Sequence, residues 1–400
     1  NGTSHHVHGT PASIPVNAEG TTVITFYSKD AAGNSEAAQT FEVKLDKTAP
    51  VIDGVTRTPA NGQGWNNTDV EARYTATDAH SGFAAGPNDA GTITFSGEGA
   101  GQSQIIEVAD LAGNTASQTV GDINIDKTAP VIDAARVTPA NAAGWNRTDV
   151  LAGYTASDAT SGLSANSPES GAHTFTDEGQ GQSHTFTVED LAGNAASATV
   201  SGVSIDKTAP TANVVRPAAG GFYALGESVL ADFACADNLS GNATCDGTFA
   251  GASPLDTATA GAKTFTVSTT DEAGNATTLN VNYTVGFRLE AFYETDKVHK
   301  AGSTVPVKLQ LLDNAGANLS TAERVVRAVG VSLVSAETYG PVADAGNANP
   351  DQNFRFDPTL GETGGYIFNL KTTGFAPGTY RLYFTVGPDP YVYTTGFQVR

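Results

Sequence analysis

Apolar and polar residues alternate along several stretches of this chain with the period-two spacing of half-buried β-strands. In the stretch 70–77 the apolar side chains fall on one side, and Glu71, Arg73 and Thr75 fall on the other. Three such stretches have the apolar series Val70, Ala72, Tyr74 and Ala76; Val150, Ala152, Tyr154 and Ala156; and Val229, Ala231, Phe233 and Cys235. Pro, Gly, Asn and Asp fill the gaps between stretches, and no stretch has a convincing helical period. We therefore expect an all-β protein.

A repeated motif divides the chain into units. The pentapeptide DKTAP begins at residues 46, 126 and 206, so it recurs every 80 residues, and each copy is followed by VADLAGN, VEDLAGN or TTDEAGN. A second alternating stretch in each unit carries Ile106 and Val108, Phe186 and Val188, or Phe265 and Val267. Units of this length made of strands and turns are typical of antiparallel β-sandwiches. The predicted domains are a partial repeat at 1–45 that holds only a second half, repeats at 46–125, 126–205 and 206–286, and a different end domain at 287–400.

The combined pattern DKTAPVI…GW…TDV…Y-A-(T/S)D…SG…DLAGN over residues 46–286 resembles bacterial immunoglobulin-like repeats of secreted and cell-surface proteins. From residue 288 the sequences KAGSTVPVKLQLLDNAG and FRFDPTLGETGGYIFNLKTTGFAPGTYRLYFTV resemble the PxKF domain, with Leu309 in place of the motif's phenylalanine. The resemblance implies tandem immunoglobulin-like β-sandwiches in a linear array. It also implies a non-enzymatic, extracellular structural or adhesive protein of the cell surface.

Nine aspartates recur at equivalent places in the three repeats. In an immunoglobulin-type sandwich the chain entry, the B–C loop and the F–G loop share one pole, so three aspartates of each repeat should converge there. These triplets are Asp46, Asp78 and Asp110; Asp126, Asp158 and Asp190; and Asp206, Asp237 and Asp271. Converging carboxylates repel one another, and calcium, which accepts six to eight oxygen ligands, removes that cost. Calcium is therefore the predicted cofactor, and it would stiffen a rod or filament subunit.

A simpler interpretation of the same aspartates is turn chemistry. Asp and Asn bond to their own backbone in turns, and DLAGN is a plausible hairpin turn whose glycine needs a positive φ. The asparagines Asn114, Asn194 and Asn275 fit such a turn better than they fit a ligand set. A resemblance to repeats of calcium-stiffened adhesins favours the metal, and both interpretations stay open at this point.

The two cysteines, Cys235 and Cys245, are ten positions apart in an acidic, β-rich chain. This spacing predicts a disulfide formed in an oxidising compartment, and the alternative is a pair of free thiols. The prediction points to secretion.

The charge balance limits the partners. A net charge of −21 argues against nucleic acids and anionic membrane surfaces as partners. The sequence contains no run of 18 apolar residues, so we expect no membrane span. No nucleophile motif such as G-x-S-x-G is present, so we expect no enzymatic activity.

The partial repeat at 1–45 should expose unpaired backbone edges, which invite pairing with another chain. We expect a homo-polymer or another cell-surface protein as the partner; the alternative is that the chain is part of a longer protein. A second functional hypothesis is the ancillary region of a secreted polysaccharide-active enzyme, with Trp65 and Trp145 as a sugar platform rather than packing residues. His5, His6 and His8 could bind a transition metal, but a strand-end cluster is the simpler interpretation.

Overall fold

The computed structural model describes residues 13–84, 89–335, 340–343 and 349–400, and His5, His6 and His8 lie outside the described residues. By their internal packing these residues form two compact units. One unit comprises the chain up to Pro139, Val150–Phe175 and Gly181–Val203; the other comprises Ala140–Asp149, Thr176–Gln180 and Ser204–Arg400. Below, repeats 1, 2 and 3 mean residues 46–125, 126–205 and 206–286, and the N-terminal hairpin means residues 13–45. The five-part domain division stays a prediction.

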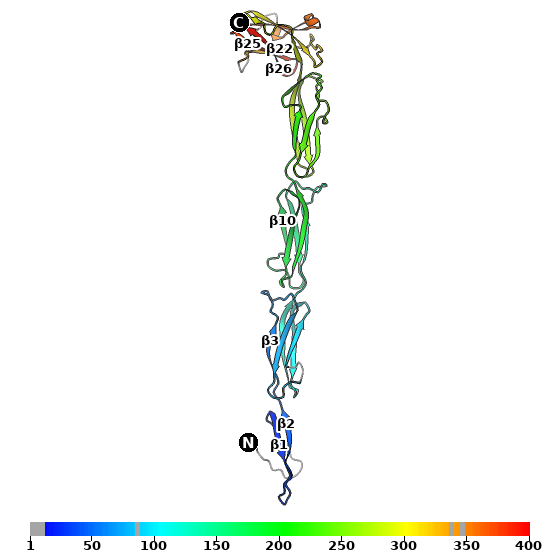
Figure 1. Cartoon of the computed structure of the whole chain (residues 1–400), viewed down its shortest axis with the longest axis vertical. Coiled ribbons are helices and arrows are strands. Elements are labelled where there is room, and N and C mark those ends of the chain that lie inside the picture. Colours follow the sequence, from blue (N-terminus) through cyan, green and yellow to red (C-terminus); the bar gives the residue numbers. More distant parts are fainter. Residues whose placement is uncertain (1–12, 85–88, 336–339, 344–348) are drawn as a thin grey trace. The chain divides into compact units, whose positions relative to one another are not determined.

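The described chain is all-β, as expected, and its only helical segments are the 3-10 turns Pro350–Gln352 and Leu360–Glu362 (Figure 1). Strands β1 (Gly20–Phe26) and β2 (Gln39–Leu45) form the N-terminal hairpin. Repeat 1 contains β3 (Val51–Arg57), β4 (Val70–Thr77), β5 (Ala90–Phe95), β6 (Gly99–Ala109) and β7 (Thr115–Ile125). Repeat 2 contains β8 (Val131–Arg136), β9 (Val150–Ser157), β10 (Ser170–Phe175), β11 (Gly179–Glu189) and β12 (Ala195–Ile205).

The third repeat and the end region contain the remaining strands. Repeat 3 contains β13 (Thr211–Arg216), β14 (Gly221–Ala224), β15 (Asp232–Ala236), β16 (Asn242–Gly247), β17 (Gly261–Asp271) and β18 (Ala276–Gly286). The end region contains β19 (Arg288–Ala291), β20 (Val298–His299), β21 (Thr304–Leu312), β22 (Val326–Leu333), β23 (Arg355–Asp357), β24 (Gly365–Lys371), β25 (Gly378–Val386) and β26 (Asp389–Val399).

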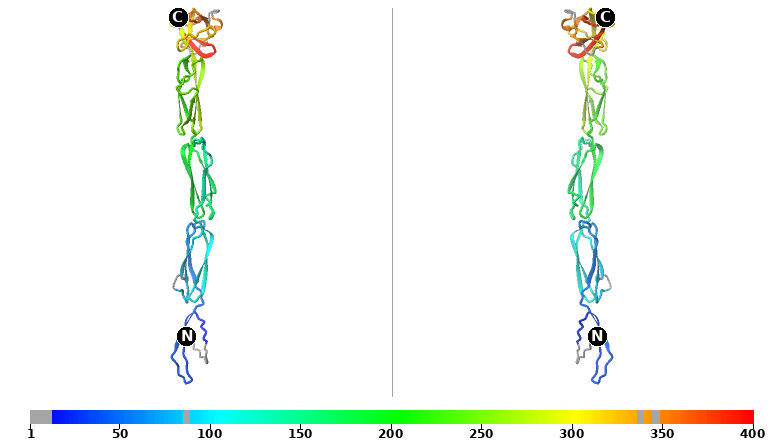
Figure 2. Two further views of the ribbon diagram at one scale, coloured as in Figure 1. Left: turned by 90° about the vertical axis from the view of Figure 1, so that its right-hand side faces the viewer. Right: turned by 90° about the vertical axis from the view of Figure 1, so that its left-hand side faces the viewer.

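Each repeat has a first-half sheet and a second-half sheet. In repeats 1 and 2 the first-half sheets have the strand orders β3-β4-β5 and β10-β9-β8, and the second halves are the pairs β6-β7 and β11-β12. Repeat 3 differs, because its first-half sheet is the pair β13-β15, and β14 and β16 join β17 and β18 in the four-stranded sheet β14-β18-β17-β16. The end region has two four-stranded sheets, β19-β21-β24-β23 and β20-β26-β25-β22. Figure 2 gives two further views of these strands.

The alternating pattern correctly predicts the inward side of the strands. In repeat 1, Val70, Ala72 and Ala76 from one sheet pack with Ile106 and Val108 from the other, and all five are buried. The equivalent residues of repeat 2 are buried too, and Phe265 and Val267 belong to the core of repeat 3. Two facing sheets with alternating inward residues make a β-sandwich, so the chain is a tandem series of such sandwiches.

The turn sequence DLAGN folds as its glycine requires. Gly113 and Gly193 have φ angles of 90° and 93°, in the left-handed region where a side chain would be strained, and Gly274 of DEAGN has a φ of 93°. In the end region Leu309 is buried within β21. None of the helical segments in the described residues is long and apolar enough to cross a membrane.

Candidate functional site

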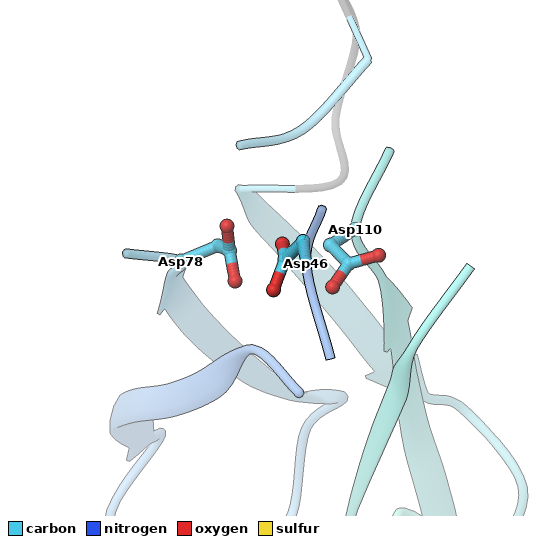
Figure 3. A group of neighbouring side chains, drawn as sticks. All are labelled: Asp46, Asp78 and Asp110. Atoms are coloured by element: carbon cyan, nitrogen blue, oxygen red, sulfur yellow. The ribbon is translucent and has the colours of Figure 1, made fainter. Parts of the chain in front are cut away.

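The structure brings together all nine aspartates that the sequence singled out. Within each triplet, one carboxylate oxygen from every member lies within 4.8 Å of the others. Figure 3 shows the first triplet, in which the carboxylates of Asp46, Asp78 and Asp110 point toward one another. The other two triplets are Asp126, Asp158 and Asp190, and Asp206, Asp237 and Asp271.

Three chain segments supply each triplet. The first aspartate directly follows the last strand of the preceding segment, as Asp126 follows β7. The second lies in the loop after β4, β9 or β15, and the third lies at the end of β6, β11 or β17. Because these loops leave the sandwich at the same end as the chain enters it, residues about 30 and 65 positions apart become neighbours.

The first aspartate ties the entry segment to the loop of its own repeat. Oδ1 of Asp126 accepts a hydrogen bond of 3.1 Å from the Thr128 amide, and Oδ2 accepts one of 3.0 Å from the Ser161 amide. Asp46 and Asp206 make the corresponding bonds in their repeats. Ser81, followed by the Thr48 amide, holds the pKa of Asp46 below its ordinary value, although desolvation opposes this effect.

The third aspartate is braced by the asparagine of its turn. The Asn194 side-chain amide donates a hydrogen bond of 2.7 Å to Oδ2 of Asp190 and another of 2.9 Å to the backbone carbonyl of Asp126. Asn114 and Asn275 repeat both bonds. Turn chemistry is therefore present at all three sites, as the simpler interpretation expected, and these asparagines serve as donors.

The second aspartate has an oxygen that turn chemistry does not use. Oδ2 of Asp78 accepts bonds from the amides of His80 and Gly82, and Oδ2 of Asp237 accepts bonds from the amides of Leu239 and Gly241. Oδ1 of Asp78 and Oδ1 of Asp237 are buried and have no hydrogen-bond partner. A buried polar atom without a partner costs about 1–3 kcal/mol, so these two oxygens fit a bound cation.

The triplets combine burial with negative charge. Asp126 and Asp206 are 0% exposed, and Asp110, Asp190 and Asp271 are also buried. In the part of the chain that the structure describes, the ion pairs of Lys and Arg go to other acidic residues and none reaches the nine aspartates. Buried carboxylates normally require a cationic partner or a metal ion. The chemistry of the donor set therefore fits a hard divalent cation.

Sequence analysis missed a glutamate that connects each repeat to the next. Oε1 of Glu98 accepts a hydrogen bond of 2.6 Å from the Lys127 amide, and its carboxylate also accepts a bond from the Thr128 hydroxyl. Glu19 makes the same contacts with Lys47 and Thr48, and Glu178 makes them with Lys207 and Thr208. The signal was the Glu-Gly dipeptide at 19–20, 98–99 and 178–179, about one repeat apart. We call this contact the glutamate clamp.

The lysine of DKTAP reaches back into the preceding repeat. Nζ of Lys127 lies 2.7 Å from Oδ1 of Asp69 and donates to the Ser96 carbonyl. Nζ of Lys207 pairs with Asp149 and donates to the Thr176 carbonyl. The aspartates of these pairs belong to the TDV sequence of the first-half sheet. The DKTAP segments that begin at residues 126 and 206 thus bond to the repeat before them through Lys and to the repeat after them through Asp.

An asparagine loop makes a further contact between successive repeats. The Asn61 side-chain amide donates a hydrogen bond of 2.8 Å to the Leu191 carbonyl in the DLAGN turn of repeat 2. Asn141 donates an equivalent bond to the Glu272 carbonyl of repeat 3. In the same loops Trp145 is 8% exposed and Trp65 is partly buried. The burial of Trp145 supports the packing interpretation of the tryptophans, since a buried ring offers no face for a sugar.

The structure contains the expected disulfide between Cys235 on β15 and Cys245 on β16. Because β15 belongs to the first-half sheet of repeat 3 and β16 to the four-stranded sheet, the bond joins the two layers of that sandwich. Repeats 1 and 2 have Ala76 and Ala156, both buried, where repeat 3 has Cys235.

Neither a protein-family profile nor a curated protein sequence matches the chain. Among solved structures, an E-to-A mutated variant of titin domains I67–I69 is similar at 9% identity, covering 68% of this chain and 98% of the titin chain, with a TM-score of 0.27. The protocadherin gammaB7 EC3-6 cis-dimer is similar at 12% identity, with coverages of 88% and 100% and a TM-score of 0.27. The human desmocollin-1 ectodomain is similar at 14% identity, with coverages of 94% and 85% and a TM-score of 0.24. Scores and identities this low support no conclusion about function.

Proposed function

We propose that this chain is a non-enzymatic, extracellular structural or adhesive protein of the cell surface, and that calcium ions at the repeat junctions stiffen it. The observation that carries the proposal is the threefold recurrence of one site. Each of the three junctions contains a triplet of aspartates, and two of the triplets contain a buried carboxylate oxygen with no hydrogen-bond partner.

The donor type selects calcium over other common metals. Each triplet consists of carboxylates, with no Cys or His among its members, and this composition suits a hard cation better than zinc or copper. Calcium takes six to eight oxygens in flexible geometry, whereas magnesium demands a near-ideal octahedron and keeps several waters. Asp126, Asp158 and Asp190 would hold the ion in repeat 2, and their counterparts would hold it in repeats 1 and 3. The bound ion would supply the positive charge that the buried carboxylates lack.

The structural role follows from where the ions would bind. The first aspartate of each triplet directly follows a strand of the preceding segment, and the other two belong to the following repeat. An ion shared by all three would therefore resist bending at the junction, together with the glutamate clamp and the Lys127–Asp69 pair. Calcium sites of extracellular modules bind with dissociation constants of about 10⁻⁴–10⁻³ M, which suits the outside of a cell. The disulfide agrees with such an oxidising compartment.

Calcium binding to the chelator-treated chain tests the proposal. Titration calorimetry should give three sites, and free calcium at tenfold the dissociation constant should stabilise the folded chain by about 1.4 kcal/mol per site. Asp237→Asn should remove one site, because the amide oxygen can still accept the turn bonds but carries no charge. Small-angle scattering should show a straighter particle with calcium than with chelator.

The matched control is Asp133→Asn, which removes the same charge from an exposed aspartate of repeat 2 outside the triplets. It should leave the stoichiometry and the calcium-dependent rise in melting temperature unchanged. The metal assignment would be lost if melting and scattering were the same with calcium and with chelator.

A further inference from the structure

The N-terminal hairpin exposes an apolar face. The register of β1 and β2 pairs Ile24 with Phe41 and Thr22 with Val43. Residues paired across an antiparallel ladder share a face, and so do residues two positions apart, so Ile24, Phe26, Phe41 and Val43 lie together. Phe26 is 50% exposed and Phe41 is 62% exposed. The opposite face carries mainly threonines and charged residues.

Complete repeats bury the corresponding face. When the DAAGN turn of the hairpin is aligned with DLAGN of repeat 1, Phe26 corresponds to Ile106, which is 2% exposed. When the hairpin's last strand is aligned on DKTAP, Val43 corresponds to Ile123, which is 3% exposed. In repeat 1 these residues pack against Val70 and the other inward residues of the first-half sheet β3-β4-β5. The chain's own repeats therefore show what kind of surface covers this face.

The junction between the hairpin and repeat 1 forms only some of the contacts seen at the later junctions. Glu19 already forms the glutamate clamp on Lys47 and Thr48, so the hairpin is seated as a second half should be. Two contacts that a first-half sheet makes at other junctions, the Lys–Asp ion pair and the Asn–Leu hydrogen bond, are not made by the described residues here. Among the described residues Lys47 has no ion pair, whereas its counterpart Lys127 pairs with Asp69 of a first-half sheet.

Two further residues lack the contacts of their counterparts: Leu111 at the junction after the hairpin, and Asp30 in the turn at the hairpin's other end. Leu111 is 62% exposed, whereas its counterpart Leu191 is partly buried and accepts a bond from Asn61 of a first-half loop. Asp30 bonds to Asn34 as Asp110 bonds to Asn114, but it belongs to no triplet among the described residues. An incoming first-half sheet would therefore continue an interface that the other junctions already display, and its TDV aspartate would match the charge of Lys47.

We infer that the N-terminal hairpin is a docking surface for a three-stranded β-sheet of the first-half type, supplied by polypeptide outside residues 13–400. The repeats described in this chain each use their first-half sheet to cover their own core, so none is free to serve. The occupant carries the sequence Asn-x-x-x-Trp-Asn-x-Thr-Asp-Val, which stands at 61–70 and 141–150. Docking is face to face, so it buries Phe26 and Phe41. This inference extends the structural role proposed above but needs no calcium.

A graft tests the docking surface in the full-length chain. Residues 126–177, the first half of repeat 2, would replace residues 1–18 so that the graft runs directly into Glu19. Hydrogen exchange in chelator should slow at least about tenfold for the amides of β1 and β2, as expected when a local opening becomes coupled to a folded core. The matched control carries the same graft with Val150→Asp and Ala152→Asp, which removes the inward face of the grafted sheet and should leave exchange fast.

Three outcomes would overturn the inference. One is exchange in β1 and β2 that is equally fast with the graft, with its control and in the parent chain. Another is protection of the ungrafted chain that grows with protein concentration, which would identify a second copy as the occupant. A third comes from a hydrophobic dye, whose binding to the parent chain should fall with Phe26→Ser and Phe41→Ser; unchanged binding would show that the face is not accessible. Since all these measurements are made in chelator, their failure leaves the calcium sites untouched, and the failure of calcium binding leaves this inference untouched.

Discussion

Glu98 accepts a hydrogen bond of 2.6 Å from the backbone amide of Lys127, and this contact joins the second-half sheet of one repeat to the first residues of the next. The Glu98 carboxylate also accepts a bond from the Thr128 hydroxyl, so one side chain fixes two consecutive residues of the DKTAP segment. The same arrangement occurs at Glu19 and Glu178. A residue-specific contact, rather than a flexible spacer, therefore connects the repeats.

Replacing Glu98 should loosen that junction. Glu98→Ala removes the bonds to Lys127 and Thr128 and should destabilise the junction by about 1 kcal/mol, because the groups are partly exposed. Trypsin should then cleave faster after Lys127. Glu107→Ala, an exposed change on β6, serves as the control and should leave the cleavage rate unchanged. Equal rates for both variants and the parent would mean that the clamp contributes nothing to order at the junction.

Removal of the disulfide should weaken repeat 3 alone. Cys235→Ser opens a loop closed by residues ten positions apart and should cost roughly 2–3 kcal/mol in the loop-entropy account. Scanning calorimetry should show one transition moving to lower temperature, with the transitions of the other repeats in place. Intact mass under non-reducing conditions is the check on the starting material, since two free thiols in the parent chain would contradict the disulfide.

Acidification should destabilise repeat 2 through a histidine pair. The rings of His173 and His184 are stacked with centroids 3.7 Å apart, and Phe175 and Phe186 contact them edge-on. Burial, and secondarily the charge of His173, lowers the pKa of His184 from its ordinary 6.5. Between the lowered pKa of His184 and its ordinary value of 6.5, the unfolded chain therefore binds more protons than the folded chain. This contribution to stability is complete above pH 6.5 and falls as the pH drops below it.

Repeat 1 provides the substitutions that test the histidine pair. It has Ile93 and Gln104 where repeat 2 has His173 and His184. The double variant His173→Ile and His184→Gln should lose part of the drop in melting temperature between about pH 7.5 and about pH 5.5. An identical drop in variant and parent would remove the pair from the explanation of acid sensitivity.

A buried tyrosine should stabilise the end region. The Tyr393 hydroxyl accepts a hydrogen bond of 3.0 Å from the Phe287 amide and donates one of 2.9 Å to Oδ2 of Asp389. Tyr393→Phe leaves both partners buried and unpaired and should cost about 1–3 kcal/mol. Tyr391→Phe removes the hydroxyl of a neighbouring, less buried ring and should have a smaller effect on urea unfolding. A smaller loss for Tyr393→Phe than for Tyr391→Phe would contradict this assignment.

The inward positions and the aspartate triplets could be predicted from the sequence pattern, because both depend on residue positions that recur in each repeat. Val70, Val150 and Val229 alternate with polar neighbours, and burial of one sheet face requires that alternation. The aspartates converge because loops that share one pole are a property of the sandwich itself.

The junction contacts and one strand assignment could not be predicted in the same way. Glu98 meets Lys127 only through the placement of one repeat after another, and its Glu-Gly signal resembles an ordinary turn. In repeat 3 the strand β16 pairs with β17 in the second-half sheet, whereas the corresponding segment of repeat 2 makes only a single bridge, from Leu163 to Asp190. Alternation shows which side of a strand faces inward, but it does not show which neighbour an edge strand pairs with.

Asp126 belongs to two repeats at once. Its backbone amide donates to the Asn66 carbonyl of repeat 1, and its carboxylate accepts from the Ser161 amide of repeat 2. One residue inserted or deleted beside Asp126 would carry one of these partners out of reach. Natural length variants of this chain should therefore keep the residues beside Asp126 in register with both partners, and recombination within the gene should be tolerated only when it preserves that register.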